Sequence, residues 1–396
     1  MVTIKLPRAD GTLAPFTPRA TVAWPIPSEP PHWNRIAFAA AHVVADPRAA
    51  VDPWLGAAID WDTTLAFRRH LWSHGFGVAE AMDTAQRGMG LDWPASLELI
   101  RRSVREARSI RGAVVFSGAG TDHLAPGVKC TIEQVIAAYE EQCAAIERLD
   151  GRIILMASRA LAACARSPDD YAQVYGRVLS QVRMPVILHW LGEMFDPALA
   201  GYWVCAGGLA SDPHHARATD VCASVINANA AKVDGVKVSL LDAEKEIALR
   251  ARLPNGVRMY TGDDFNFASL IGGDATGYSD ALLGIFDAIA PAASAALTAL
   301  AAGDRALFNA ILAPAVPLSR HVFAAPTRFY KTGVVFLAWL NGHQAHFTMV
   351  GGQQSARSLL HLSELFRLAD AAGLLREPEL AVARMRAFLG VNGIDG

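Results

Sequence analysis

The chain has 396 residues, 52% hydrophobic and 19% charged, which is enough apolar material for a large buried core and excludes a mainly disordered chain. Its 36 Lys and Arg balance 38 Asp and Glu at a net charge of -2, which excludes a global basic field that attracts nucleic acid or anionic lipid. Five widely spaced cysteines without a Cys-x-x-Cys pair argue against a disulfide framework or a structural zinc site. The proline-rich residues 1–31 lack the apolar core of a signal peptide, and no run of ~20 apolar residues follows, so we expect a cytoplasmic protein with no nucleic-acid or membrane partner.

Short apolar runs typical of strands alternate with longer amphipathic runs typical of helices from about residue 34 onward. The strand-like runs cover residues 35–44, 76–82, 113–117, 152–157, 185–190, 233–239, 257–263 and roughly 275–279. The helical runs that follow them cover residues 62–74, 92–110, 131–149, 168–182, 214–230, 242–252, a short stretch after 266 and a long one from 294. Eight such units predict an α/β fold in which a parallel sheet closes into a (β/α)8 TIM barrel. A doubly wound open sheet is the competing fold, but no Gly-x-Gly-x-x-Gly follows the first run.

We expect a single structural domain in three parts. Residues 1–33 form an N-terminal arm, residues 34–300 form the barrel, and residues 301–396 form C-terminal helices packed on the barrel. Apolar residues recur at helical spacing within 332–340 and 359–372 of the last part.

Lys237 is the strongest candidate for a chemical role. Side chains alternate between the two faces of a strand, so in residues 233–239 Val236 and Val238 share one face, while Lys237 and Ser239 share the other. Since the apolar face meets the outer helices, Lys237 is predicted to point into the barrel. Burial disfavours the charged ammonium and lowers its pKa, which frees a neutral amine to attack a carbonyl carbon and form an imine. The alternative is a lysine near a strand end whose ammonium pairs with a carboxylate.

The same strand carries a family resemblance. Its sequence Val-Asp-Gly-Val-Lys-Val-Ser, followed by Tyr260-Thr-Gly-Asp-Asp264, resembles the dihydrodipicolinate synthase and N-acetylneuraminate lyase superfamily. The chain looks closest to a divergent branch of it, with stretches like 79–90 and 189–195, and the resemblance covers residues 34–375. It implies a TIM barrel in which Lys237 is the Schiff-base lysine, a small carbonyl substrate, no cofactor beyond the covalent lysine imine, and assembly into a homo-oligomer.

The loop after the second run departs from that superfamily's pattern. Superfamily members have Gly-x-x-Gly-Glu there, whose hydroxyls and backbone amides hold the carboxylate of a 2-oxo acid, whereas this chain has residues 81–86 with Asp83 and one threonine, Thr84. Two like charges at ~4 Å cost several kcal/mol in a low-dielectric site, so a carboxylate substrate is disfavoured unless Arg87 compensates. We therefore expect Asp83, Thr84 and Gln86 to bind hydroxyls of a neutral carbonyl compound such as a keto sugar. The alternative for Asp83 is a helix N-cap or an ordinary loop residue.

The fifth run has a histidine where the superfamily usually has a proton-relaying tyrosine. His189 shares a face with Ile187, and if the opposite face, which includes Trp190, packs on helices, His189 points inward. A histidine relays protons near neutral pH, so His189 is a catalytic candidate, and a structural histidine in the core is the alternative. Glu193 follows in the loop at the carboxyl end of the strand, where chemistry occurs in this architecture, and is a second acid or base candidate.

Further polar residues near strand ends complete the predicted substrate-binding set: Glu80, Ser117, Asp263 and Asp264. A structural ion pair is the alternative for Glu80, and a cap for the next helix is the alternative for the two aspartates. His42 and His123 also fall near strand ends and are weaker candidates.

These residues predict a Schiff-base-forming lyase, either an aldolase or a dehydratase, that acts on a small carbonyl compound such as a keto sugar or a sugar-acid derivative. One rival is a metal-dependent TIM-barrel sugar isomerase or hydrolase, since His42, Glu80, His123, His189, Glu193 and Asp263 are metal-ligand types, although neither His-x-His nor His-Glu-x-x-His occurs. A divalent metal is therefore not excluded. The other rival is a non-catalytic barrel that binds a metabolite.

Overall fold

Eight parallel strands close into a barrel, and the computed structural model describes residues 2–125, 129–204 and 212–395. The strands are β3 (Ala37–Ala40), β4 (Gly77–Glu80), β5 (Val115–Ala119), β6 (Arg152–Leu155), β7 (Val186–Leu191), β8 (Val233–Ser239), β9 (Arg258–Thr261) and β10 (Asp280–Leu283). They follow the order of the chain around the barrel, and β10 closes it by pairing with β3. The predicted (β/α)8 TIM barrel is confirmed.

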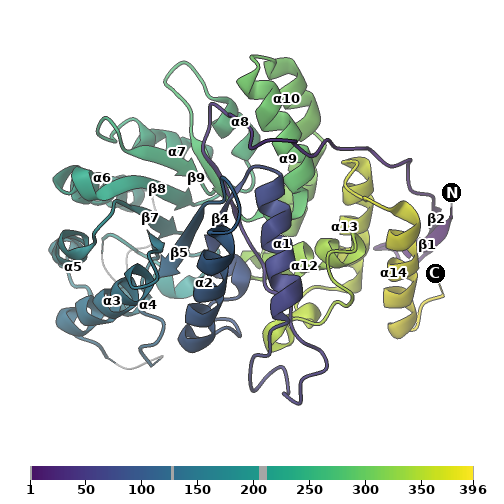
Figure 1. Ribbon diagram of the computed structural model, residues 1–396, viewed down its shortest axis with the longest axis horizontal. Helices are drawn as coiled ribbons and strands as arrows, with labels where there is room; N and C mark the ends of the chain where they lie inside the picture. The colour runs from purple at the N-terminus through teal and green to yellow at the C-terminus, as the bar shows by residue number, and fades with distance from the viewer. Residues whose placement is uncertain (1, 126–128, 205–211, 396) are drawn as a thin grey trace.

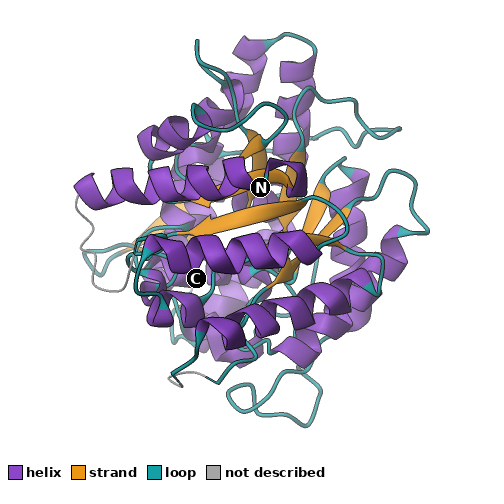
Figure 2. Cartoon of the chain, turned by 90° about the vertical axis from the view of Figure 1, so that its left-hand side faces the viewer, coloured by secondary structure: helices purple, strands orange, loops and turns teal. Residues whose placement is uncertain are grey.

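Helices follow the strands and enclose them (Figures 1 and 2). They are α1 (Trp61–Ser73), α2 (Trp93–Ala107), α3 (Ile132–Glu147), α4 (Arg159–Cys164), α5 (Pro168–Gln181), α6 (Asp212–Ala228), α7 (Ala243–Arg250), α8 (Phe267–Gly272) and α9 (Ile285–Ala301). Helix α3 begins with a capping box: Thr131 accepts from the Gln134 backbone N–H, and the Gln134 side chain accepts from that of Thr131.

Two boundaries near the end of the barrel differ from the sequence prediction. The last strand lies at Asp280–Leu283 instead of 275–279, because Gly273 and Gly277 have positive φ and close a tight turn over those residues. Helix α9 begins before residue 294 and continues through Pro291, with a kink at Ile289.

Strand alternation separates two apolar cores. The side chains on the outer face of the strands pack against the helices. The side chains on the inner face pack against one another inside the barrel and form a compact cluster of Phe38, Ala79, Phe116, Ile187 and Leu282. This division fixes the orientation of every polar side chain on the strands. In β8, Val236 and Val238 belong to the outer core, which leaves Lys237 on the inner face as predicted.

Five more helices follow the barrel in the described part of the chain, and two of them, α13 and α14, form the right-hand side of Figure 1. They are α10 (Arg305–Leu312), α11 (Ala315–Val322), α12 (Tyr330–Leu340), α13 (Leu359–Ala371) and α14 (Pro378–Val391). The N-terminal hairpin of β1 (Ile4–Pro7) and β2 (Leu13–Phe16) packs on α13, where the Phe16 and Phe366 rings lie 5.8 Å apart. Every residue of α12 is buried, so the apolar stripe seen in the sequence is used within the chain and provides no surface for a second copy.

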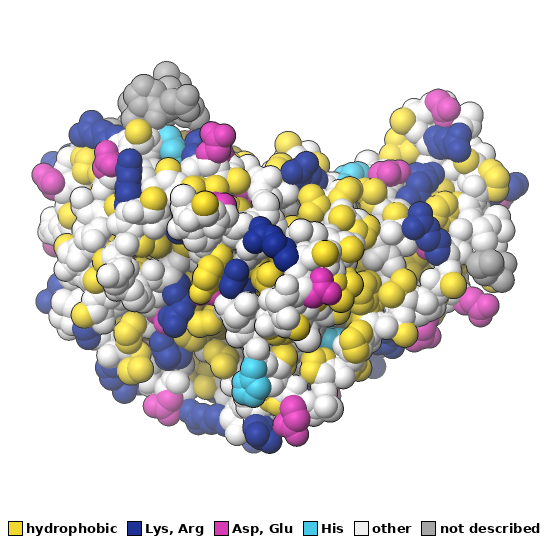
Figure 3. All heavy atoms as spheres, turned by 90° about the horizontal axis from the view of Figure 1, so that it is seen from above, with side chains coloured by type: hydrophobic (Ala, Val, Ile, Leu, Met, Phe, Trp, Pro, Cys, Tyr) yellow, Lys and Arg dark blue, Asp and Glu magenta, His cyan; other side chains and the backbone are white. Residues whose placement is uncertain are grey.

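The surface has no strong charge pattern on the face shown in Figure 3, where Lys and Arg alternate with Asp and Glu. Among the described residues, no helix is long and apolar enough to cross a membrane. Four of the five cysteines are described and none of these forms a disulfide; Cys205 lies outside the described residues.

Glu80 and Ser117 face the helices instead of the barrel interior, so the expectation that they bind substrate is wrong. Glu80 shares the outer face of β4 with Val78 and accepts hydrogen bonds from Arg68 at 2.8 and 2.9 Å and from Ser103. Ser117 alternates with the inward Phe116 and is fully buried. Both side chains of the Arg68–Glu80 pair are fully buried, so the pair is structural.

Removing one partner of this pair tests the assignment. We expect Glu80→Ala to lower the free energy of unfolding by about 3–5 kcal/mol, because the Arg68 charge is left buried without a counter-charge. Urea denaturation followed by circular dichroism measures the change. The control is Glu98→Ala, which removes a partly exposed pair with Arg101 and Arg102 and should cost less than about 1 kcal/mol. Equal losses in the two variants would contradict a structural role for Glu80.

Candidate active site

Lys237 lies on the inner face of β8 and is only 7% exposed. Among the residues that the structure describes, no carboxylate approaches its amine within 4 Å, so the expected alternative of a direct ion pair does not hold. Burial lowers the pKa of Lys237 to about 8, while the more distant negative charges of Asp264 and Asp83 oppose this shift. A substantial fraction of the amine is therefore neutral near physiological pH.

A glycine makes room for this lysine. Gly262, which directly follows β9, lies beside Lys237 and Ser239. A Cβ atom at position 262 would lie 2.7 Å from Lys237 Cε and 2.3 Å from Ser239 Oγ. Any larger residue would therefore displace the lysine side chain or the serine hydroxyl.

His189 lies directly opposite Lys237 in the β7–β8 register and also faces inward. Its Nε2 atom lies 3.1 Å from the Ser239 hydroxyl, and its buried Nδ1 atom has no hydrogen-bond partner among the described residues. Burial and the neighbouring Lys237 charge lower the pKa of His189 well below its usual value. This shift favours the neutral ring, and the catalytic role of His189 stays a prediction.

Asp264 follows β9 and is the acidic group most strongly coupled to Lys237 by charge. Its carboxylate accepts a hydrogen bond of 2.8 Å from the Ile285 backbone N–H, which fixes its position. Burial raises the pKa of Asp264 to about 7, although the Ile285 N–H and the Lys237 charge favour the ionised form. Asp264 can therefore gain and lose a proton near neutral pH.

Asp83 also faces this centre, but a second lysine neutralises it. Asp83 lies in η1 (Asp83–Ala85), a short 3-10 turn after β4. The Lys331 Nζ atom on α12 lies 3.2 Å from the Asp83 Oδ1 atom. The Lys331 side chain is fully buried. The sequence offers Arg87 as a residue that could compensate the charge of Asp83, but Arg87 binds Asp122 at 2.7 and 3.0 Å instead. Asp83 therefore presents a paired charge, and its remaining Oδ2 atom is buried without a hydrogen-bond partner among the described residues.

The first residue of α12 contributes a phenol to the same region. The Tyr330 hydroxyl lies 2.7 Å from the Thr84 hydroxyl, and both side chains are buried. Burial and the negative charge of Asp83 raise the pKa of Tyr330, so the phenol is protonated at physiological pH. Thr84 is thus held by the C-terminal helices, next to the Asp83–Lys331 pair.

Three other predicted residues are occupied or lie elsewhere. The Gln86 side chain donates a hydrogen bond of 2.6 Å to the Val350 carbonyl, and the Asp263 carboxylate accepts from Phe265 and Asn266 in the turn before α8. Glu193 is exposed after β7 and borders a different, smaller cavity beside Trp190. The Gln86 Oε1 atom is buried without a hydrogen-bond partner among the described residues, so binding of a substrate hydroxyl by Gln86 stays a prediction. The expectations that Asp263 binds substrate and that Glu193 acts at this centre are not met.

The predicted metal ligands do not converge. His42 binds Asp287 at 2.8 Å, His123 binds Gln142 at 2.7 Å, and Glu80 binds Arg68. Within the described part of the chain, no three or more His, Cys, Asp or Glu side chains are placed to hold a metal ion together.

Tyr330 and Lys331 were not predicted from the sequence, because they begin an apolar helix more than 90 residues after Lys237 along the chain. The available signal was the position of Lys331 directly before a continuous apolar segment, because a lysine buried with that segment requires a partner. Ser239 was placed on the correct face of β8 but was not assigned to the site.

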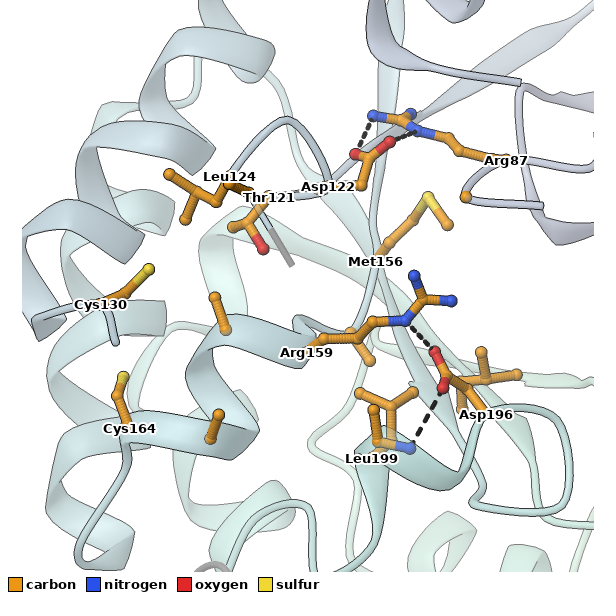
Figure 4. Close-up of a pocket in the computed structure, with 18 of the residues that line it drawn as sticks. Arg87, Thr121, Asp122, Leu124, Cys130, Met156, Arg159, Cys164, Asp196 and Leu199 are labelled. Atoms are coloured by element: carbon orange, nitrogen blue, oxygen red, sulfur yellow. Dashed lines mark hydrogen bonds and ion pairs between the residues drawn. The ribbon is translucent and has the colours of Figure 1, made fainter. Parts of the chain in front are cut away.

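A cavity of about 680 Å³ adjoins this centre at the carboxyl ends of β4 to β7 (Figure 4). Asp83 lines the cavity and is also coupled by charge to Lys237, so it connects the two. Catalytic groups of TIM barrels lie at this end of the strands.

Comparison with known proteins agrees with this architecture. A family model described as "Protein of unknown function (DUF993)" matches residues 4–394. The chain belongs to this family. No curated protein matches the chain significantly.

Solved structures share the fold of this family member at low sequence identity. Dihydrodipicolinate synthase from Aquifex aeolicus has a TM-score of 0.64 at 11% identity, with coverage of 86% of this chain and 99% of that one. YagE, a prophage protein of the dihydrodipicolinic acid synthase family from E. coli K12 in complex with pyruvate, has a TM-score of 0.62 at 13% identity, with coverage of 90% and 98%. The 4-hydroxy-tetrahydrodipicolinate synthase from Methylacidiphilum fumariolicum SolV has a TM-score of 0.63 at 13% identity, with coverage of 89% and 98%. The predicted resemblance to the dihydrodipicolinate synthase superfamily is confirmed for the fold.

The lowered pKa of Lys237 predicts the pH dependence of its reaction with formaldehyde. Only the neutral amine forms an imine, so reductive methylation of Lys237 should rise with pH around a midpoint of about 8 instead of the usual 10.5. Asp264→Asn removes a negative charge that favours the ammonium, so its midpoint should move to lower pH. Peptide mass spectrometry over a pH series measures both profiles. A midpoint near 10.5, or an upward shift in Asp264→Asn, would contradict the described environment.

The close approach of Gly262 gives a second prediction. Gly262→Ala should decrease methylation of Lys237 at pH 8 at least tenfold, because the added methyl group occupies space needed by Lys237 Cε. Gly176→Ala is the matched control, since a Cβ there meets nothing within 4 Å and lies in helix α5. The control should react like the wild type and gain up to about 1 kcal/mol of stability. Unchanged labelling in Gly262→Ala would show that the two side chains are not in contact.

Proposed function

We propose that this protein is a Schiff-base-forming lyase of the class I aldolase type, with Lys237 as the nucleophile. The observation that carries the proposal is a desolvated lysine amine on the inner face of the barrel, with no carboxylate in contact among the described residues. A neutral amine in such a place is what carbonyl addition requires. The shared fold of dihydrodipicolinate synthase structures supports the proposal.

The reaction begins with attack of the neutral Lys237 Nζ on a ketone or aldehyde carbon. The resulting carbinolamine takes up a proton at its oxygen and loses water, which leaves a protonated imine. The protonated imine accepts the electron pair of a bond at the neighbouring carbon atom, which gives an enamine. In an aldolase this bond is a carbon–carbon bond that breaks. In a dehydratase it is a carbon–hydrogen bond, and the enamine then expels a hydroxyl group as water. In the aldolase outcome, the released fragment loses its hydroxyl proton and leaves as a carbonyl compound, and protonation of the enamine and hydrolysis of the imine return the free amine. In the dehydratase outcome, loss of hydroxide converts the enamine into a conjugated imine, whose hydrolysis returns the free amine. The aldolase and dehydratase outcomes share every step up to the imine.

Asp264 is the proposed proton carrier for these steps. It is coupled to Lys237, and its pKa of about 7 allows it both to donate and to accept a proton at physiological pH. The protonated Tyr330 hydroxyl, held by Thr84, is proposed to donate a hydrogen bond to the substrate oxygen. His189 takes the role of a neutral hydrogen-bonding partner that holds Ser239 beside the amine, in place of the acid role expected from the sequence.

Pairing of Asp83 with Lys331 changes the expected substrate. The sequence argued against a carboxylate substrate on the ground of an uncompensated Asp83, but Lys331 supplies a positive charge 3.2 Å away. The hydroxyl-binding set proposed for a keto sugar is also reduced, since both carboxylate oxygens of Asp263 accept internal hydrogen bonds. A 2-oxo acid is therefore as acceptable as a neutral ketone, and the site no longer favours a sugar.

Borohydride trapping tests the proposed function. Incubation of the protein with pyruvate or with 2-butanone, followed by borohydride, should add the mass of the reduced compound to the peptide that contains Lys237. Lys237→Arg keeps a cationic side chain and should form no adduct at that position. Lys331→Arg keeps the charge beside Asp83 and should retain the adduct. An adduct on Lys331, or none with either compound, would contradict the proposal.

A further inference from the structure

The cavity beside the candidate active site is large and enclosed by several elements. Its volume of about 680 Å³ falls within the ~300–1,000 Å³ of pockets that hold drug-sized ligands. Helix α4, the loop after β5 and the 3-10 turn η2 (Pro197–Leu199) form its walls (Figure 4). A three-carbon carbonyl compound at Lys237 would leave most of this space filled with water.

Two residues that line the cavity also lie close to the strands of the reactive centre. Met156, which follows β6, lines the cavity and also packs against the apolar cluster inside the barrel. Leu191, at the end of β7, lines the cavity and pairs in register with Ser239, two residues beyond Lys237. With Asp83, these residues connect the cavity lining to the strands that carry Lys237 and Ser239, which places the cavity beside the reactive centre.

The walls of this cavity are predominantly apolar. The apolar residues of the lining include Leu124, Met156, Ala160, Ala163, Leu191 and Leu199. Four of its charged groups form two ion pairs: Arg87 with Asp122 at 2.7 Å, and Arg159 with Asp196 (Figure 4). Asp83 is paired with Lys331, and Lys129 is a further charged residue of the lining.

This lining discriminates between substrate classes. Each sugar hydroxyl that enters without a hydrogen-bond partner loses its contacts with water, at a cost of about 1–3 kcal/mol. An aryl or alkyl group instead gains from leaving water, by about 25 cal/mol for each Å² of apolar surface buried. The predominantly apolar lining therefore favours an apolar substituent over a polyhydroxylated one.

We propose that the substrate is a carbonyl compound with an extended aryl or alkyl substituent, whose carbonyl carbon meets Lys237 and whose substituent occupies this cavity. This proposal rests on the proposed function, because the imine with Lys237 fixes where the carbonyl group of the substrate lies. The cavity itself provides a binding contribution that does not require a covalent bond.

A matched pair of ketones tests the substituent. 2-Butanone and 4-phenyl-2-butanone share a methyl ketone and differ by a phenyl group, so the proposal predicts half-maximal borohydride adduct at a concentration at least tenfold lower for the phenyl compound. Dihydroxyacetone, as a small keto sugar, should show no such advantage over 2-butanone. Equal half-maximal concentrations for the two methyl ketones would overturn the proposed substrate class and leave the imine chemistry intact.

A variant that fills the cavity tests whether the phenyl group binds there. Ala160→Trp places a large side chain in the cavity from helix α4, so the advantage of the phenyl compound should fall below threefold. Ala172→Trp makes the same change at an exposed position of helix α5, outside the cavity, and should keep the full advantage. Ala160→Leu provides a smaller version of the change if the tryptophan variant does not fold, and should reduce the advantage in the same direction. An advantage that persists in the folded Ala160 variants would overturn the assignment of the cavity.

A non-covalent measurement separates the two proposals. Calorimetric titration of Lys237→Ala with 4-phenyl-2-butanol, which forms no imine, should show binding that Ala160→Trp weakens at least tenfold, whereas 2-butanol should bind at least tenfold more weakly. Binding of the phenyl alcohol without any ketone adduct in the wild type would overturn the imine mechanism alone. No difference between the two alcohols would overturn the cavity proposal, whatever the result of trapping.

Discussion

The chemistry proposed for this protein depends on the removal of one amine from water without a contacting counter-charge. Lys237 occupies the inner face of β8, where burial penalises its ammonium form, and the two nearest acidic groups act on it only from beyond ion-pair distance. This balance keeps a large fraction of the amine neutral near pH 8. A direct carboxylate contact would restore the ammonium and remove the nucleophile, so the position of the acids matters as much as their presence.

The C-terminal helices maintain this balance from outside the barrel. Lys331, at the start of α12, binds Asp83 and offsets a negative charge that otherwise favours the ammonium form of Lys237. Tyr330, one residue earlier, holds Thr84. Because the rest of α12 is buried among apolar side chains, these two polar residues have fixed positions relative to the barrel. The segment that looks like an appendage in the sequence thus supplies part of the site.

Sequence periodicity was sufficient for the barrel because each strand is short, apolar and followed by a helix, and because alternation alone determines which face Lys237 and His189 occupy. Sequence periodicity could not predict which polar side chains contact one another. Glu80 accepts hydrogen bonds from Arg68 on the preceding helix and from Ser103, which follows it by more than 20 residues. These contacts arise only when the chain folds, so the local sequence around Glu80 does not indicate them. The Asp83–Lys331 contact spans almost 250 residues, and nothing in the local pattern of either residue identifies the other. Likewise, nothing in the sequence pattern reveals that both carboxylate oxygens of Asp263 accept hydrogen bonds from Phe265 and Asn266.

A crystal structure of the protein after borohydride reduction with a bound ketone tests the central claim most directly. The account predicts continuous electron density from Lys237 Nζ to the carbon of the former carbonyl group, with the Asp83–Lys331 pair intact beside it. Density that joins the ligand to Lys331 instead, or a Lys237 amine that remains unmodified while the ligand lies elsewhere, would contradict the account.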